Sequence, residues 1–225
     1  MKFIVLVLCV SSFVFGMSLS DMDSHRANID EGLMSIKIVS IKKNKKTKKT
    51  YDVFRKNSNT SLVVFTHENE KGTVVLKENN NLYIKTQYAR NPIRITPMQR
   101  LFGDASIGDV LELTFSKNYK IQSSNNGVYV LKAINNKSSY NKIIVYVKNN
   151  KLIKSELFSF SGKKLKTLFY KYNKKTKLID SYTIKTPRSQ TLVEIVSYKN
   201  MKLSRRIFKL QNIKNAYYAT KKYRK

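Results

Sequence analysis

The sequence is most informative between residues 71 and 119, where it reads KGTVVLKENNNLYIKTQYARNPIRITPMQRLFGDASIGDVLELTFSKNY. Two short apolar runs, 73–76 and 82–85, flank an asparagine-rich turn, which is typical of two antiparallel strands. Within 111–115 the apolar residues alternate with polar ones, and this period of two predicts a further half-buried strand. The stretch therefore favours a β-rich domain.

The segment 91–109 interrupts this pattern, because it is too long and too polar for a plain hairpin turn. It contains Gly103-Asp104-Ala105-Ser106 and, three residues later, Asp109. We expect the two aspartates to cap a turn or to pair with nearby arginines, and so to pin the loop. Residues 97–102 are spaced for a short helical turn. The residues predicted to pin the loop are Arg90, Arg94, Arg100, Gly103, Asp104 and Asp109.

Strand-like runs recur along the rest of the chain, with turn signals between them. An amphipathic helix is predicted over 23–34, and strands over 35–42 and 50–56 flank a lysine-loaded turn. The further strands that we expect span residues 61–67, 128–133, 142–147, 152–160, 164–172, 179–185, 191–197 and 206–210. Such a meander twists and can nearly close on itself. We predict a mainly β fold with short helices, in which a curled antiparallel sheet forms an incomplete half-barrel covered by a lid of helix and loop.

The N-terminus has the pattern of a secretory signal peptide. One lysine precedes an apolar run of about 13 residues, which is too short to span a bilayer. We predict a signal peptide over residues 1–16, with the cut possible as late as residue 20; an uncleaved anchor is the alternative. Cys9, with Leu6 before it, resembles a lipidation site, but Leu8 occupies the position where a small residue is required. The chain ends in a basic tail, 221–225, which we expect to be frayed.

Charge is the second strong feature. The chain carries 44 basic and 14 acidic residues, a net charge of +30. A charge of this size favours a polyanion or an anionic membrane surface as a partner. Lysine-rich composition also follows from an AT-rich genome, so the excess charge has a compositional explanation as well.

The sequence offers no pattern of an enzyme. His25 and His67 stand far apart without neighbouring cysteines or paired acids, so neither a metal site nor a cofactor is expected. Asp104 and Asp109 form a pair of carboxylates that can in principle serve acid–base chemistry, but a structural role is favoured. No glycine-rich phosphate loop or nucleophile elbow is present.

The order of elements in residues 71–119 resembles the outer-membrane lipoprotein-sorting family, the LolA-like group of periplasmic carriers. Runs at 129–133, 140–143 and 208–210 are also similar, so the resemblance covers roughly residues 36–212. It implies one LolA-like lipoprotein-carrier domain over 17–220, located in the periplasm, which ferries lipoproteins from the inner to the outer membrane. The chain departs from the family in having no tryptophan where Tyr83 stands.

The resemblance also implies the partners. These are acylated lipoproteins or lipid, an inner-membrane lipoprotein-releasing transporter, and a transient contact with an anionic membrane; no nucleic acid is expected, and a shuttle of this kind is expected to be a monomer. Acyl chains require apolar lining. The residues predicted to form the lipid-binding cavity or its lid are Phe54, Val64, Leu76, Ile84, Met98, Leu101, Phe102, Leu113 and Phe115. An error of one residue in strand register moves a side chain to the opposite face.

Two other hypotheses remain open. A LolA-like module can sense lipids or lipoproteins instead of carrying them. An exported polyanion-binding protein is the other possibility, because aromatic and basic residues interleave at 169–172 and 217–223. Steep salt dependence of binding favours the polyanion hypothesis, whereas salt-insensitive acyl binding favours the carrier. We expect the predicted N-terminal helix and the loop 91–109 to gate the cavity.

Overall fold

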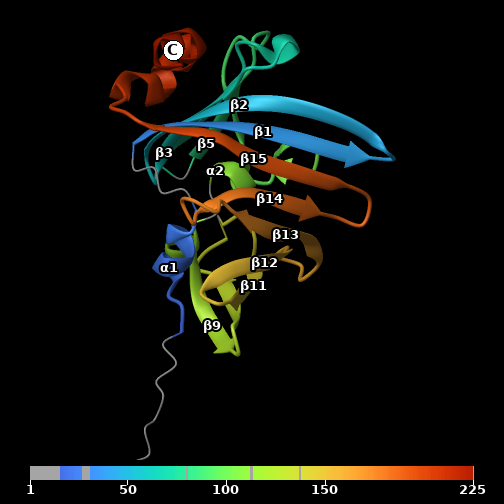
Figure 1. Cartoon of the computed structure of the whole chain (residues 1–225). Helices are drawn as coiled ribbons and strands as arrows, with labels where there is room; N and C mark the ends of the chain where they lie inside the picture. The colour runs from blue at the N-terminus through green and yellow to red at the C-terminus, as the bar shows by residue number, and fades with distance from the viewer. Residues whose placement is uncertain (1–15, 27–30, 80, 112–113, 137, 225) are drawn as a thin grey trace, which may run out of the picture.

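The computed structural model describes residues 16–26, 31–79, 81–111, 114–136 and 138–224. Thirteen strands form one antiparallel sheet that is not closed into a barrel, and short helices accompany it (Figure 1). The predicted fold class is therefore confirmed. The strands are β1 (Gly32–Lys42), β2 (Lys45–Asn57), β3 (Thr60–Phe65), β4 (Val74–Glu78), β5 (Asn81–Lys85), β6 (Ile93–Ile95), β9 (Tyr119–Asn125), β10 (Val128–Ala133), β11 (Lys142–Lys148), β12 (Lys151–Phe158), β13 (Lys164–Tyr172), β14 (Ile179–Lys185) and β15 (Gln190–Asn200). A separate two-stranded sheet joins β7 (Arg100–Phe102) to β8 (Ala105–Ser106).

The sheet is two meanders joined at its centre. Strands β1 to β6 follow one another outward on one side, and β9 to β15 return on the other side until β15 pairs with β1. In this central pair Ile38 lies opposite Val193. Tight turns connect neighbours; the β9–β10 turn, for example, is made by Asn126 and Gly127, both with positive φ. The first and last strands of the sheet are therefore neighbours at its centre, and β6 and β9 are its two edges.

Side chains alternate between the two faces of the sheet, and each face carries a buried core. We call inner face the one that packs on α1 (Leu19–Ser24), α2 (Ile107–Leu111) and α3 (Phe115–Asn118). Figure 1 shows α2 within the curve of the sheet and α1 at its open end. The inner-face core contains Ile36, Ile38, Val53, Val63, Val75, Leu131, Ile143, Leu157, Leu168, Ile184 and Val193, among others.

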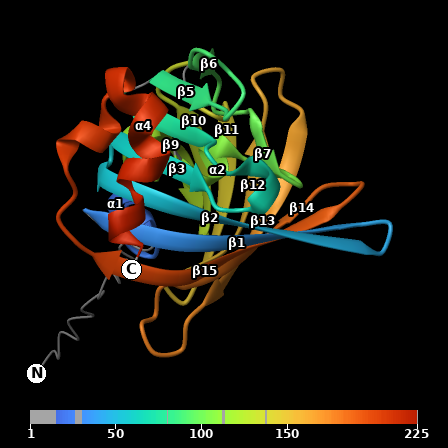
Figure 2. The same cartoon turned by 90° about the horizontal axis from the view of Figure 1, so that it is seen from above.

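The outer face of β2 to β5 is covered by the C-terminal segment. This segment consists of the turns η2 (Arg205–Phe208), η3 (Leu210–Asn212) and η4 (Lys221–Tyr223) and the helix α4 (Ile213–Ala219) (Figure 2). Residues 206–210 were predicted to be a strand, but they lie in 3-10 turns. The tail was expected to be frayed, yet Arg224 forms an ion pair with Asp52 at 3.2 Å.

The N-terminal helix differs from its prediction. The helix spans Leu19–Ser24, not 23–34, and Gly32 already begins β1. Ser18 and Asp21 form a capping box, in which Ser18 Oγ accepts from the Asp21 backbone N–H at 3.1 Å and Asp21 accepts from Ser18 N–H at 3.0 Å. The cap fixes the start of the helix earlier than the apolar spacing indicated. Residues 27–30 lie outside the described part of the chain.

Three further local predictions are corrected. The expected turn 42–49 is only Lys43 and Asn44, because β1 and β2 continue to either side of them. Residues 97–102 were expected to be helical, but their last three residues form β7. The strand expected over 111–115 is instead the end of α2 and the start of α3. Residues 112 and 113 are not described. Among the residues that the structure does describe, no helix is long and apolar enough to cross a membrane.

Candidate functional site

A cavity lies between the inner face and the helices α1 and α2. Its volume is about 100 Å³, whereas sites for drug-sized ligands span roughly 300–1,000 Å³. The walls come from the central strands and from α2. The lining residues are Asp23, Arg26, Met34, Ile36, Arg55, Val110, Leu111, Thr114, Ile179, Tyr182, Val193, Ile195 and Tyr198. The cavity is therefore smaller than an ordinary ligand site.

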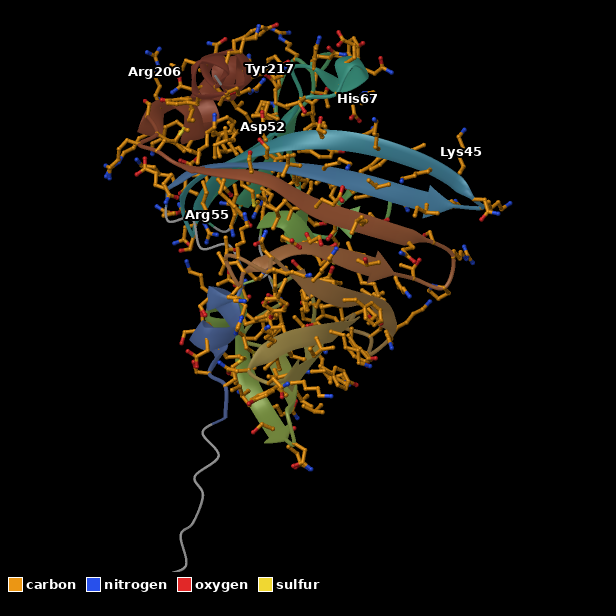
Figure 3. The ribbon with its side chains drawn as sticks, in the orientation of Figure 1. Lys45, Asp52, Arg55, His67, Arg206 and Tyr217 are labelled. Atoms are coloured by element: carbon orange, nitrogen blue, oxygen red, sulfur yellow. The ribbon has the colours of Figure 1, made fainter. Side chains whose placement is uncertain are left out.

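The cavity continues into a polar groove. Asp23, Arg55 and Thr114 line both spaces, and the groove has a volume of about 580 Å³. Lys56 and Lys202 add positive charge there, next to Glu31. Figure 3 shows Arg55 at the end of the sheet nearest α1. A largely apolar interior thus leads to a wide polar mouth that carries both cations and carboxylates.

Two polar side chains at the cavity are fixed by the same backbone carbonyl. Arg26 donates from Nη2 to the backbone carbonyl of Asp109 at 3.2 Å. Tyr182 donates to the same carbonyl at 3.3 Å. Burial raises the pKa of Tyr182, so its hydroxyl stays neutral. A few fixed polar groups among apolar walls are typical of small-molecule sites.

Asp109 anchors α2 to the sheet. Its carboxylate accepts hydrogen bonds from the Lys166 Nζ at 2.7 Å, the Tyr140 hydroxyl at 2.5 Å and the Ser106 backbone N–H at 2.8 Å. Asp109 is fully buried, and Lys166 is 7% exposed. Burial, and then the negative charge of Asp109, hold the pKa of Tyr140 well above its usual range. A buried carboxylate needs such partners, so α2 is fixed to β13.

Asp104 anchors the β7–β8 hairpin to one end of the central strands β1 and β15. Its carboxylate accepts from the hydroxyls of Ser189 at 2.8 Å and Thr191 at 2.9 Å. Gly103 has φ +58°, and a Cβ there would approach Ser40 Cβ to 2.9 Å and Thr191 Oγ1 to 2.5 Å. Only glycine fits this contact. The Gly103-Asp104 element therefore docks the hairpin on β1 and β15.

Asp23 joins α1 to α3. Its carboxylate accepts from the backbone N–H groups of Phe115 and Ser116 at 2.7 and 2.9 Å, and thereby caps α3. The residue after α1, His25, accepts a hydrogen bond at its carbonyl from Ile179 N–H at 2.8 Å. These contacts, together with Arg26, hold α1 over the open end of the sheet.

The predicted loop-pinning residues are only partly brought together. Lys166, which is not one of the predicted arginines, is the cation bonded to Asp109, and this corrects the predicted pairing. Arg94 instead donates to Asn81 Oδ1 at 2.6 Å, and Arg90 and Arg100 are exposed. Arg94 lies on the edge strand β6 and Arg100 on β7, and the side chains of all three arginines are exposed. The aspartates and Gly103 do hold the loop, through partners distant in sequence.

The predicted cavity residues divide between the two faces. Phe54, Val64 and Leu76 lie in the outer-face core under the C-terminal segment, and this corrects their predicted place. Their strand neighbours Val53 and Val75 face inward instead. Leu101 and Phe115 belong to the inner-face core, Ile84 and Phe102 pack against it, Met98 is 42% exposed, and Leu113 lies outside the described residues.

Sequence reasoning missed the residues that line the cavity, since none of the eight predicted residues that the structure describes does so. Alternation within β1 was the available signal, because Met34 and Ile36 share one face. Among the described residues, no group of three or more His, Cys, Asp or Glu side chains is placed to hold a metal ion. His25 packs edge-on against the Tyr172 ring at 5.6 Å, and burial lowers its pKa.

Comparison with solved structures identifies the class of fold. A LolA superfamily protein from Nitrosomonas europaea has a TM-score of 0.76 at 23% identity, over 85% of this chain and 95% of that one. A putative outer-membrane lipoprotein-sorting domain from Vibrio parahaemolyticus has a TM-score of 0.66 at 14% identity, over 87% and 96%. A DUF1329 family protein from Desulfovibrio piger has a TM-score of 0.68 at 14% identity, over 87% and 95%. The predicted LolA-like resemblance is therefore confirmed for the fold.

Comparison of the sequence with family models assigns the chain to a family. A family model whose description reads "-like: Uncharacterized protein" matches residues 56–215, which is more than half of the chain. The chain belongs to this family. No curated protein sequence matches it.

Proposed function

We propose that the protein is a periplasmic carrier that binds the acyl chains of lipoproteins and ferries them from the inner to the outer membrane. The observation that carries this proposal is the largely apolar cavity between the inner face and α1–α2, which continues past Arg55 into a polar groove. The fold shared with a lipoprotein-sorting domain supports it. In this arrangement acyl chains enter the cavity, and the polar end of the cargo remains in the groove.

Cargo binding requires the lid to move, because about 100 Å³ is too little for an acyl chain. Burying a C16 chain is worth about 12 kcal/mol at roughly 0.8 kcal/mol per CH₂, which is enough to offset the separation of a short helix. Asp109 holds α2 through buried charged contacts, whereas α1 is held by its buried Met22, by the cap of Asp23, by Arg26 and by one backbone bond. We therefore assign the movement to α1 and leave α2 as the floor of the cavity.

The remaining parts of the carrier hypothesis are also proposals. They are an inner-membrane lipoprotein-releasing transporter as the donor, a monomeric shuttle, and a transient contact with anionic membrane. Export requires the signal peptide. A cut after residue 16 is supported over a later one, because Met17 is buried in the core and Ser18 caps α1.

A matched pair of tryptophan substitutions on β15 tests the site. Ile195 lines the cavity, whereas the adjacent Val196 is 63% exposed and is not among the lining residues. With a fluorescent C16 fatty acid or a triacylated lipopeptide as ligand, Ile195→Trp is expected to weaken binding at least tenfold, because the indole occupies the cavity. Val196→Trp is expected to bind as the wild type does. Equal binding by both variants contradicts a cargo site at this position, provided that circular dichroism shows both to be folded.

A further inference from the structure

The hairpin of β1 and β2 extends beyond the strands on both sides of it. On one side, the last pair between β1 and β15 is Ile41 with Gln190. On the other side, the pairing of β2 with β3 ends at Tyr51 and Phe65. Residues 42–49 therefore project as a two-stranded ribbon, visible at the far end of β1 and β2 in Figure 1, with Lys45 labelled near its tip in Figure 3. We call this segment the lysine ribbon.

The lysine ribbon concentrates positive charge that is almost unpaired. Six of its eight residues are lysines and none is acidic: Lys42, Lys43, Lys45, Lys46, Lys48 and Lys49. Lys49 forms an ion pair with Glu70 at 2.7 Å. Among the described residues, the other five have no carboxylate within ion-pair distance. Elsewhere on the sheet, acids do meet lysines, as Glu194 meets Lys37 at 2.6 Å.

Two features of the lysine ribbon destabilise it. Lys42 lies directly opposite Lys45, and like charges opposite each other destabilise a strand pair. The turn residues Lys43 and Asn44 have φ of 47° and 61°, a left-handed conformation that favours glycine or asparagine over lysine. A two-stranded ribbon without further neighbours is marginal in water. An anion placed along the ribbon removes the repulsion.

The pattern of the lysines selects the kind of anion. Successive strand residues point to opposite faces, so Lys45 and Lys46 give the ribbon charge on both sides. The ribbon contains no aromatic residue for base stacking and no arginine for bidentate phosphate recognition. A cluster of four to eight basic residues can bind anionic lipid headgroups by charge alone, at about 1 kcal/mol per lysine near the surface. We propose that the lysine ribbon docks the protein onto an anionic phospholipid bilayer.

Docking by the ribbon is separate from cargo binding. Met34 and Arg55 line the cavity at the other end of the same hairpin. Nine residues of extended strand separate Lys43 from Met34, or about 30 Å at 3.3 Å per residue. The ribbon therefore acts as a tether, which can hold the surface while the mouth of the cavity stays off it. This inference rests on the proposed function only in taking a membrane as the surface encountered.

Vesicle sedimentation tests the proposal with the full mature chain. Lys45, Lys46 and Lys48 are replaced by Gln together, and the matched control replaces Lys174, Lys175 and Lys177, exposed lysines of the β13–β14 turn, which removes the same charge. On phosphatidylglycerol–phosphatidylcholine vesicles at low salt, the ribbon variant is expected to bind about 100-fold more weakly, at about fivefold per lysine. The control is expected to stay within a few-fold of wild type. Vesicles of phosphatidylcholine alone are expected to bind none of the three proteins.

Two outcomes overturn the proposal. An equal loss of vesicle binding in both variants shows that net charge, and not the ribbon, is responsible. A wild-type protein that is retained on heparin but does not bind vesicles has a soluble polyanion as its partner. The acyl-ligand assay keeps this result apart from the proposed function. We expect the ribbon variant to bind the C16 fatty acid normally and Ile195→Trp to bind vesicles normally, so each hypothesis can fail while the other stands.

Discussion

Lys166 and Asp109 form a buried ion pair, with Lys166 Nζ 2.7 Å from Asp109 Oδ2, although 57 residues separate them in the sequence. The pair joins the floor helix of the cavity to β13. Tyr140 and the Ser106 backbone N–H complete the hydrogen bonds of the carboxylate. Because both charges are removed from water, each depends on the other.

Lys166→Met is expected to destabilise the protein strongly, because it leaves a buried carboxylate without its cation. Removing one partner of a buried pair costs about 3–5 kcal/mol. Urea unfolding followed by circular dichroism measures the change in the free energy of unfolding. Lys37→Met is the control, since its pair with Glu194 is 40% and 35% exposed and is expected to lose no more than about 1 kcal/mol. Similar losses in the two variants contradict an anchoring role for Lys166.

Asp23→Ala is expected to weaken the attachment of α1 while leaving the apolar core residues unchanged. The substitution removes the acceptor for the first N–H groups of α3, at a cost of about 1 kcal/mol. We expect fatty-acid association to become faster, because the lid opens more often. Stopped-flow fluorescence measures the rate. Asp180→Ala is the control, because it removes a carboxylate bonded to the neighbouring Ser181. Its fatty-acid association rate should equal that of the wild type. An unchanged rate in Asp23→Ala argues against α1 as the gate.

Alkaline pH is expected to unfold the protein through its buried tyrosines. Burial raises the pKa of Tyr140, Tyr182 and Tyr198, and it raises the pKa of Tyr172 to about 12. A raised pKa means that the folded state keeps protons that the unfolded state releases. The stabilisation is therefore complete below pH 10, the value for a free tyrosine, and is lost as the pH rises toward the folded-state values.

Phenolate absorbance and circular dichroism, recorded together against pH, check this prediction. We expect part of the phenolate signal to appear in the same step as the loss of secondary structure. A smooth titration near pH 10 that reaches all 14 tyrosines while the fold persists contradicts the burial of these hydroxyls.

N-terminal sequencing of the exported protein is expected to begin at Met17. The Met17 backbone nitrogen lies 2.7 Å from the Tyr129 hydroxyl, and the side chain is buried. A cut as late as residue 20 also removes Ser18, the cap of α1, and is expected to lower stability by about 1 kcal/mol. A mature chain that begins after residue 18 contradicts this expectation.

Local sequence patterns predicted those elements that depend on local interactions. The bounds of β10, β13 and β14 match the prediction, because alternation and adjacent turn residues specify them. The pattern at 111–115 failed because the start of α3 is capped by Asp23, 92 residues earlier in the chain. No local pattern encodes such a partner.

The candidate site was less predictable than the fold. Phe54, Val64 and Leu76 were assigned to the cavity, but they face the C-terminal segment, since one position of register exchanges the two faces. The two faces of β2 to β4 are both apolar, so alternation of polarity gave no signal there. Asp104 and Asp109 were recognised as pinning residues, yet their partners come from β13 to β15 and the β14–β15 turn, which only the folded sheet brings near.

Native mass spectrometry of the protein purified from the periplasm, with lipid extraction in parallel, tests the carrier proposal most directly. We expect acyl lipid or triacylated lipoprotein to co-purify, to remain bound in high salt, and to be absent from Ile195→Trp but present in Val196→Trp. A protein that arrives empty, and that also fails to take a triacylated lipoprotein from detergent, contradicts the proposal that the cavity carries acyl chains.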